Sequence, residues 1–293
     1  MRLITLAAAG LATLALGSVG LAVAQEGGAT SAISPMHLDE PAGGWSFEGY
    51  TGTFDKNQLQ RGYKVYREVC SSCHSMKLMS FRNLGQKGGP FYDPDFKNPG
   101  DNPRVKALAA ELQMPDIDHD TGDAIQRPGV ASDTFPSPFA NEYAARGGNG
   151  GALPPDLSVI VKAREGGPSY VYSLLTGFVE PPAGLKVNEG QHYNRAFSGD
   201  TGSQWSGDPR LKPVGGFLAM APPLKADGQV TFDDDTKPTV KQMAQDVATF
   251  LAWASDPKQE TRRQMGVAVV GYLAIFALLV FLSYRRIWRN VEH

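Results

Sequence analysis

The chain has 293 residues, a formal net charge of -2 and 42% hydrophobic residues, a balance that suits a folded domain and argues against a nucleic-acid-binding protein. Glycine and proline are abundant, with 33 and 21 residues, well above their usual joint share of about 12%. This composition predicts a domain rich in loops, with few regular elements.

Residues 1–24 have the pattern of an export signal. Arg2 precedes an apolar run, and Ala22-Val23-Ala24 forms a small-residue cleavage site before Gln25. The mature chain is therefore expected to begin near Gln25, outside the cytoplasm. From residue 25 to residue 258 there are 22 Lys and Arg against 28 Asp and Glu. This acidic excess favours a basic protein partner over nucleic acid.

The first helix is predicted from Asp55 to Met76, where apolar residues recur at helical spacing. This stripe places the two cysteines of the chain on the buried face. Gly62 interrupts the same face, and the close approach of another helix would account for it. The stripe consists of Leu59, Tyr63, Tyr66, Val69, Cys70 and Cys73.

This helix carries Cys70-Ser71-Ser72-Cys73-His74, a Cys-x-x-Cys-His pentapeptide typical of c-type haem attachment. Two thiols at this spacing can add to the two vinyl groups of one porphyrin, and His74 can then reach the iron. A structural zinc site would need four ligands, but the chain has only 2 cysteines and no His-x3-5-His partner. A thioredoxin-like pair would need a βαβ context, and a disulfide closing so short a loop would stabilise little.

Residues 81–152 are predicted to be mostly loop, with a helix at 102–112 and a short one at 141–146. An acidic run resembles a calcium loop but lacks glycine at its sixth position and glutamate at its twelfth, so a solvated loop is favoured. The acidic residues are Asp116, Asp118, Asp120 and Asp123.

Two further helices are predicted at 156–164, with Asp156 as N-cap, and at 169–176. Residues 184–216 show no regular pattern. The last helix of the exported domain is predicted at 239–253.

Thr239 and Gln242 match a capping box at the start of that last helix. Its apolar stripe is the natural partner for Gly62 and Tyr66. An N-terminal helix that crosses a C-terminal one is the frame of the small c-type cytochrome fold.

The iron of such a haem needs a second axial ligand, and Met220 is the favoured candidate. It lies in the apolar stretch 217–224, whose paired prolines hold a short segment extended. His192 and His119 remain alternatives. A thioether opposite histidine raises the reduction potential, which suits a carrier at the oxidising end of an electron-transport chain.

Residues 265–284 carry no charge and would span about 30 Å as a helix, enough to cross a bilayer. The export signal sets the orientation, with the haem domain outside. The expected division is a signal peptide at 1–24, an exported haem c domain at 25–258, a linker and transmembrane helix at 259–284 and a cytoplasmic tail at 285–293.

With these motifs in this order, the chain resembles the cytochrome c1 family, the haem c subunit of the ubiquinol-cytochrome c reductase (cytochrome bc1) complex. The landmarks are Gln60–Tyr66 before the pentapeptide, Arg127-Pro128-Gly129, Gly151–Ser158 and Met220–Leu224. The resemblance implies a mainly α, loop-rich class I c-type cytochrome domain with one C-terminal transmembrane helix.

The resemblance also implies one haem c, covalently bound through Cys70 and Cys73, with His74 and Met220 on the iron. Arg164 is then expected to face a propionate. The residues implied to line the haem are Asn149, Pro154, Pro155, Tyr170 and Leu175. Some bacterial relatives carry an extra cysteine pair near the axial methionine, and its absence here leaves the loop 184–216 to be held by packing alone.

The implied function is electron transfer from a Rieske iron-sulfur protein to a c-type cytochrome, with no bond made in a substrate. The implied setting is a dimeric complex with cytochrome b in a bacterial inner (cell) membrane, the single-pass chain holding its haem domain on the periplasmic side. An anchored monohaem cytochrome serving another oxidoreductase is one alternative, which co-purification with cytochrome b would exclude. A haem peroxidase is another, and would need an open iron position or a second Cys-x-x-Cys-His.

The acidic balance predicts how delivery of electrons to a basic cytochrome c depends on salt. The second-order rate should fall as ionic strength rises, because electrostatic steering is screened over about 10 Å at 0.1 M salt. Stopped-flow reduction of a basic cytochrome c over a salt series measures this. A rate that does not change between low and moderate salt would show that the acidic residues serve solubility alone.

Overall fold

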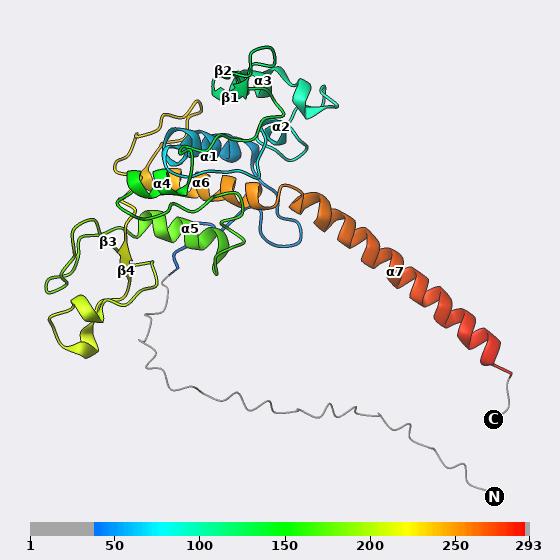
Figure 1. The fold of residues 1–293 in the computed structure, drawn as a ribbon. Helices are drawn as coiled ribbons and strands as arrows, with labels where there is room; N and C mark the ends of the chain where they lie inside the picture. Colours follow the sequence, from blue (N-terminus) through cyan, green and yellow to red (C-terminus); the bar gives the residue numbers. More distant parts are fainter. Residues whose placement is uncertain (1–37, 291–293) are drawn as a thin grey trace, which may run out of the picture. The chain divides into compact units, whose positions relative to one another are not determined.

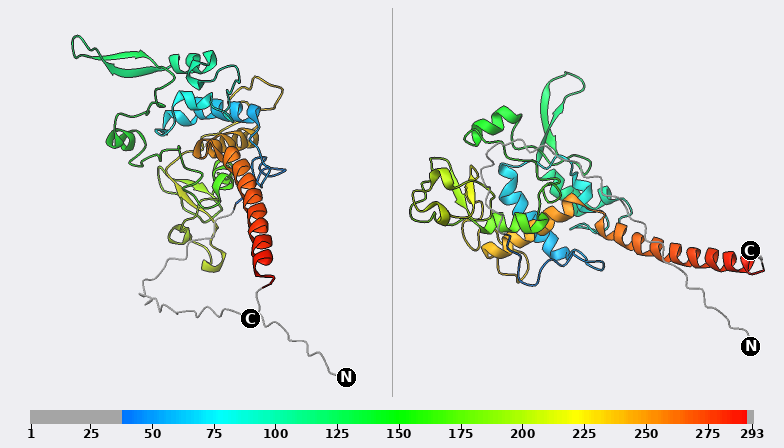
Figure 2. Two further views of the ribbon diagram at one scale, coloured as in Figure 1. Left: turned by 90° about the vertical axis from the view of Figure 1, so that its right-hand side faces the viewer. Right: turned by 90° about the horizontal axis from the view of Figure 1, so that it is seen from below.

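In the computed structural model, which describes residues 38–290, the core forms where two helices cross, α1 (Lys56–Glu68) and α6 (Val240–Ser255) (Figure 1). Each begins at a side-chain cap: Asp55 accepts a hydrogen bond from the backbone N–H of Gln58, and Thr239 accepts one from that of Gln242. The two helices also lie side by side in both views of Figure 2. The predicted pairing of an N-terminal helix with a C-terminal one is confirmed. The predicted export signal lies outside the described residues.

Gly62 allows this crossing. A Cβ placed on it would lie 2.1 Å from the carbonyl oxygen of Asp246 on α6 and 2.7 Å from the Cβ of Phe250. Only a residue without a side chain permits such an approach of two backbones. One turn later, the ring centroid of Tyr66 lies 5.8 Å from that of Phe250. The close helix approach expected at Gly62 is therefore confirmed.

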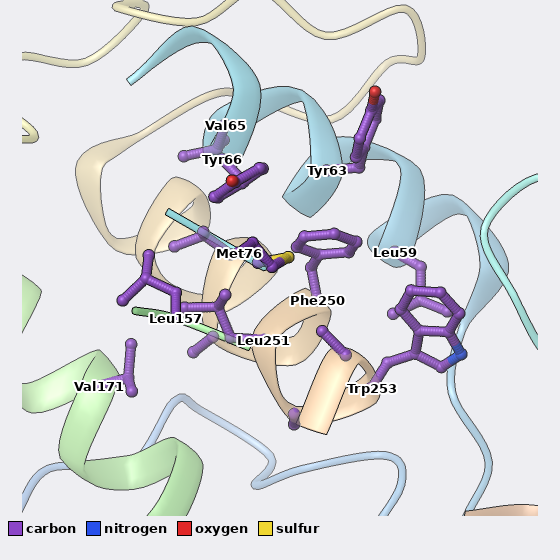
Figure 3. Packing of buried hydrophobic residues seen from close by; sticks show 14 of the residues in the cluster. Leu59, Tyr63, Val65, Tyr66, Met76, Leu157, Val171, Phe250, Leu251 and Trp253 are labelled. Carbon is purple, nitrogen blue, oxygen red and sulfur yellow. The ribbon is translucent and has the colours of Figure 1, made fainter. Parts of the chain in front are cut away.

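The core extends from this crossing on both sides of α6. Met76, which is fully buried, and Leu157 lie in this core beside residues of α1 and α6 (Figure 3). Helix α5 (Gly167–Thr176) packs against α6 and contributes Val171. The core thus contains side chains from α1, α5 and α6 and from the loops next to the predicted haem-binding residues.

The remaining helices before residue 259 are short. Those predicted at 102–112 and 141–146 are present as α3 (Pro103–Ala110) and α4 (Glu142–Gly148), capped by Asn102 and Asn141. Helix α2 (Phe81–Leu84) was not predicted. Single 3-10 turns cover Cys70–Ser72, Pro99–Asp101, Gly202–Gln204 and Pro209–Leu211.

Two small antiparallel sheets occupy stretches that were predicted as loop. The first is the hairpin of β1 (Gln113–Ile117) and β2 (Ala124–Pro128), whose connecting turn holds most of the acidic run (Figure 2). The second pairs β3 (His192–Asn194) with β4 (Gly216–Leu218). Neither shows the apolar alternation of a half-buried strand, which is why the pattern in the sequence did not reveal them.

Helix α7 (Gln259–Trp288) is continuous over 30 residues and is apolar enough to cross a membrane. The stretch predicted as a linker is thus its first turns. They are hydrogen-bonded to the loop before α1: Gln259 donates to the carbonyl of Phe47 at 3.0 Å, and Glu260 accepts the N–H of Phe54 at 2.6 Å. In the described part of the chain, no residue of α7 is buried.

The helix crossing predicts the effect of adding one methyl group. Gly62→Ala should lower the free energy of unfolding by about 2 kcal/mol, because overpacking of about 3 kcal/mol exceeds the gain of about 1 kcal/mol in helix propensity. Denaturant unfolding of the purified protein measures it. Gly147→Ala in α4 is the matched control, since a Cβ there meets no atom within 4 Å. Equal stability of the two variants would contradict the crossing geometry.

Candidate functional site

The pentapeptide lies on a tight turn at the end of α1 rather than within a helix. The carbonyl oxygen of Cys70 accepts hydrogen bonds from the N–H groups of Cys73 at 3.2 Å and His74 at 2.9 Å. The first helix was predicted to continue to Met76, but it ends at Glu68, and a 3-10 turn follows at Cys70–Ser72. The prediction that both thiols lie on the buried face is confirmed for Cys70, which packs against the core, and is wrong for Cys73, which is exposed.

The two thiols are free and differ in their surroundings. Burial of the Cys70 thiol, and then the charge of Cys73, raises the pKa of Cys70 to about 12, although the residue as a whole is only half-buried. Cys70 is therefore a neutral thiol at physiological pH. Reactive redox pairs lower a thiol pKa instead, which argues against a thioredoxin-like role.

His74 is held in one tautomer by a backbone carbonyl. Its Nδ1 lies 2.8 Å from the carbonyl oxygen of Pro155. Because a carbonyl only accepts, Nδ1 carries the proton, and Nε2 keeps its lone pair. Burial lowers the pKa of His74, against the opposing effects of the Pro155 hydrogen bond and the charge of Asp156. A neutral imidazole with a free Nε2 and a fixed Nδ1 is the form that ligates a metal.

Asp156 joins the segment after the pentapeptide to the segment around Pro155. Its carboxylate accepts hydrogen bonds from the Ser75 hydroxyl at 2.8 Å and from the N–H groups of Lys77 and Ser158, each at 2.9 Å. The N–H of Leu157 donates to the carbonyl of Ser75 at 2.8 Å. These bonds pull residues 155–158 alongside residues 75–78 and hold Pro155 in reach of His74.

The helix predicted at 156–164 is absent, and residues in this range form turns instead. The Asp156 carboxylate accepts hydrogen bonds from a distant segment as well as from Ser158. The pKa of Asp156 is raised by burial, but the hydrogen bonds from Ser158, Lys77 and Ser75 outweigh burial and lower it below its usual value. The residue therefore remains ionised at neutral pH.

The other predicted haem residues come from α4, α5 and the chain between them. Asn149 ends α4, is half-buried, and donates to the carbonyl of Ala145 at 2.7 Å. Tyr170 is buried on α5, Leu175 and Pro154 are half-buried, and Arg164 is exposed. Of this set, only Pro155 is hydrogen-bonded to His74 within residues 38–290.

Met220 and its two rivals lie on different elements. Met220 is half-buried and follows β4 by two residues. Leu218 of β4 pairs with His192 of β3, so His192 lies in the small sheet that Met220 directly follows. His119 instead lies exposed in the turn of the β1–β2 hairpin. Its place on a separate hairpin disfavours His119 as a ligand.

A hollow of about 570 Å³ lies elsewhere, between α1, α3 and residues 232–234. Its charged walls are paired, with Arg61 bonded to Asp234, Lys64 to Asp233 and Arg67 to Glu111. It has none of the pentapeptide residues in its lining.

Within residues 38–290, no group of three or more His, Cys, Asp or Glu side chains is placed to hold a metal ion. The pentapeptide offers one neutral imidazole beside two free thiols, and haem iron needs only one or two protein ligands, so these donors fit haem. A model of the Cytochrome C1 family matches residues 45–291. The chain belongs to the cytochrome c1 family. The resemblance found in the sequence is confirmed, and with it a haem-bearing protein of electron transport.

Individual relatives match up to 98% of the chain. Cytochrome c1 of Rhodospirillum rubrum is 39% identical, covering 98% of this chain and 97% of that protein. Mitochondrial cytochrome c1 1, heme protein, of Arabidopsis thaliana is 42% identical over 85% of this chain and 72% of that protein. Cytochrome b/c1 of Bradyrhizobium diazoefficiens is 41% identical over 98% of this chain, which spans 39% of that longer protein.

Asp156 carries a testable part of this geometry. Asp156→Asn should lower the free energy of unfolding by about 2 kcal/mol, because hydrogen bonds to a charged acceptor contribute about 1.5–3 kcal/mol. The lowered pKa of Asp156 means that this contribution is present above the unfolded pKa of about 3.9 and is lost as pH falls through the folded pKa.

The measurement is denaturant unfolding between pH 7 and pH 3. The gap between wild type and Asp156→Asn should narrow as pH falls below about 4. Asp123→Asn, an exposed carboxylate on the hairpin, is the control and should change little. A gap that stays constant from pH 7 to pH 3 would show that the asparagine disturbs packing rather than hydrogen bonding.

Proposed function

We propose that this chain is the membrane-anchored haem c subunit of a cytochrome bc1 complex, which receives one electron from a Rieske iron-sulfur protein and passes it to a c-type cytochrome. The observation that carries the proposal is the bond between His74 Nδ1 and the Pro155 carbonyl, 2.8 Å long, beside two free cysteines. It prepares Nε2 for iron on the same turn as the thiols.

The residues of the chain would divide the work of holding one covalent haem c. Cys70 and Cys73 would form the two thioether links, and His74 and Met220 would be the protein ligands of the iron. The haem supplies one-electron redox chemistry. Lining residues exclude water, and Arg164 offsets the charge of a propionate. The proposed lining consists of Asn149, Pro154, Pro155, Tyr170 and Leu175.

The proposed anchor is α7, which at 30 residues measures about 45 Å and exceeds the thickness of a bilayer core. Arg285 and Arg286 lie at its far end, but Arg262 and Arg263 lie at its near end, so these charges do not set the orientation. The predicted export signal supports a single-pass protein of a bacterial inner membrane with its haem domain, residues 25–258, on the periplasmic side. The proposed partners are cytochrome b and a Rieske protein in a dimeric complex.

Replacing Met220 tests the proposed ligand set. Met220→Leu should keep haem attached through Cys70 and Cys73 but lower the reduction potential strongly, because leucine cannot ligate iron and the thioether favours the ferrous state. A redox titration of the purified complex, read from reduced-minus-oxidised spectra, measures the change.

His192→Gln is the matched control, since it lies on the paired strand and should leave the potential unchanged. The reverse result, in which the His192 variant loses potential and the Met220 variant keeps it, would move the ligand to His192. Co-purification of cytochrome b and a Rieske protein with the chain tests the partner assignment separately.

A further inference from the structure

The segment that carries Met220 is fixed at two ends. Before it, β4 is paired with β3, and Asn194 of β3 donates to the carbonyl of Leu174 at the end of α5, at 2.8 Å. After it, the side chain of Leu224 enters the core with 6% of its surface exposed. Met220 therefore sits on a short bridge between a small sheet and a core anchor.

Gln229 ties the second end together. Its Nε2 donates to the carbonyl of Pro223 at 2.9 Å, and its Oε1 accepts the N–H of Lys225 at 2.8 Å. One side-chain amide thus bonds to the backbone carbonyl before Leu224 and to the backbone N–H after it. Pro222 and Pro223 have no N–H, so this stretch cannot form a backbone ladder. The Gln229 side chain forms the hydrogen bonds to the Pro223 carbonyl and the Lys225 N–H instead.

Gln229 is itself held against the two main helices. Val230, the next residue, is 1% exposed in the core. The N–H of Gly228 donates to the carbonyl of Pro238 at 2.8 Å, and Asp227 accepts the N–H of Val240 at the start of α6, at 2.7 Å. Further along, Asp234 is bonded to Arg61 of α1 at 2.6 Å. The amide of Gln229 therefore connects the Met220 segment to the helix that leads into the pentapeptide.

We propose that Gln229 is a positioning residue for Met220, acting through Pro223 and Lys225. This inference rests on the proposed ligation of iron by Met220. Pro222 and Pro223 each have a fixed φ, so few backbone angles between Met220 and Pro223 can absorb a shift at Pro223, and the shift reaches the methionine. Holding a ligand in place before it binds removes an ordering cost from the bond it forms.

Carbon monoxide provides the test, because it binds ferrous haem only when the sixth position opens. Gln229→Ala removes both hydrogen bonds. Gln229→Glu keeps an acceptor for Lys225 and loses the donor to Pro223. One hydrogen bond contributes about 0.5–1.5 kcal/mol, so each bond lost should raise the open fraction, and with it the carbon monoxide affinity, about two- to tenfold. Gln126→Ala, exposed on β2, is the control.

The expected order of carbon monoxide affinity in the purified full-length holoprotein is Gln229→Ala above Gln229→Glu above wild type, with Gln126→Ala equal to wild type. A reduction potential that falls in the same order would support a ligand effect, which loss of stability alone does not produce. If Gln229→Ala fails to fold, Gln229→Glu decides the question. Wild-type affinity in the folded Gln229 variants would overturn the role of Gln229.

Met220→Leu separates this inference from the proposed function. High carbon monoxide affinity in Met220→Leu together with wild-type affinity in the Gln229 variants refutes the positioning role alone. Wild-type affinity in Met220→Leu itself refutes the ligand assignment on which the role rests.

Discussion

The approach of α1 to α6 at Gly62 is the constraint on which the rest of the structure depends. The backbones meet so closely that a Cβ would lie 2.1 Å from a carbonyl oxygen of the other helix. Arg61, beside the glycine, donates to the fully buried carboxylate of Asp246 at 2.8 Å. Burial raises the pKa of Asp246 against the opposing effect of Arg61. Such a pair adds little net stability, but it leaves the helices one acceptable register, since a shift would strand a buried charge.

That register sets the place of the pentapeptide, because Cys70 lies at the end of α1 within one turn of Tyr66, which packs on Phe250. Met76, beyond the pentapeptide, returns into the same core with 0% exposure. The turn that carries both thiols and His74 is thus anchored in the core at either end. The Asp156 hydrogen bonds then bring the Pro155 carbonyl to His74, so the tautomer of the histidine follows from the packing of two helices.

How much of this could be predicted from the sequence depends on the range of the interactions. Local signals located α1, α3, α5 and α6, and the Cys-x-x-Cys-His spacing located the site. The helix expected at 156–164 is absent because Asp156 bonds to Ser75 and Lys77, some 80 positions away. Likewise β3 and β4 exist only as partners of each other. Thr239 caps α6, but Gln242 donates to Asp246 instead of completing the box. Long-range hydrogen bonds decided the first two cases, and a local bond four positions along the helix decided the third.

The two sides of the proposed iron site are therefore held by different means. On the histidine side, residues 75–78 and 155–158 are joined by several hydrogen bonds, and each segment has one side chain buried in the core, Met76 and Leu157. On the methionine side, the supports are a sheet of three residue pairs and the exposed amide of Gln229, which water can replace. Local opening starts where buried contacts are fewest. The methionine side of the proposed site should therefore open first, while the proposed thioether links and His74 would keep the haem in place.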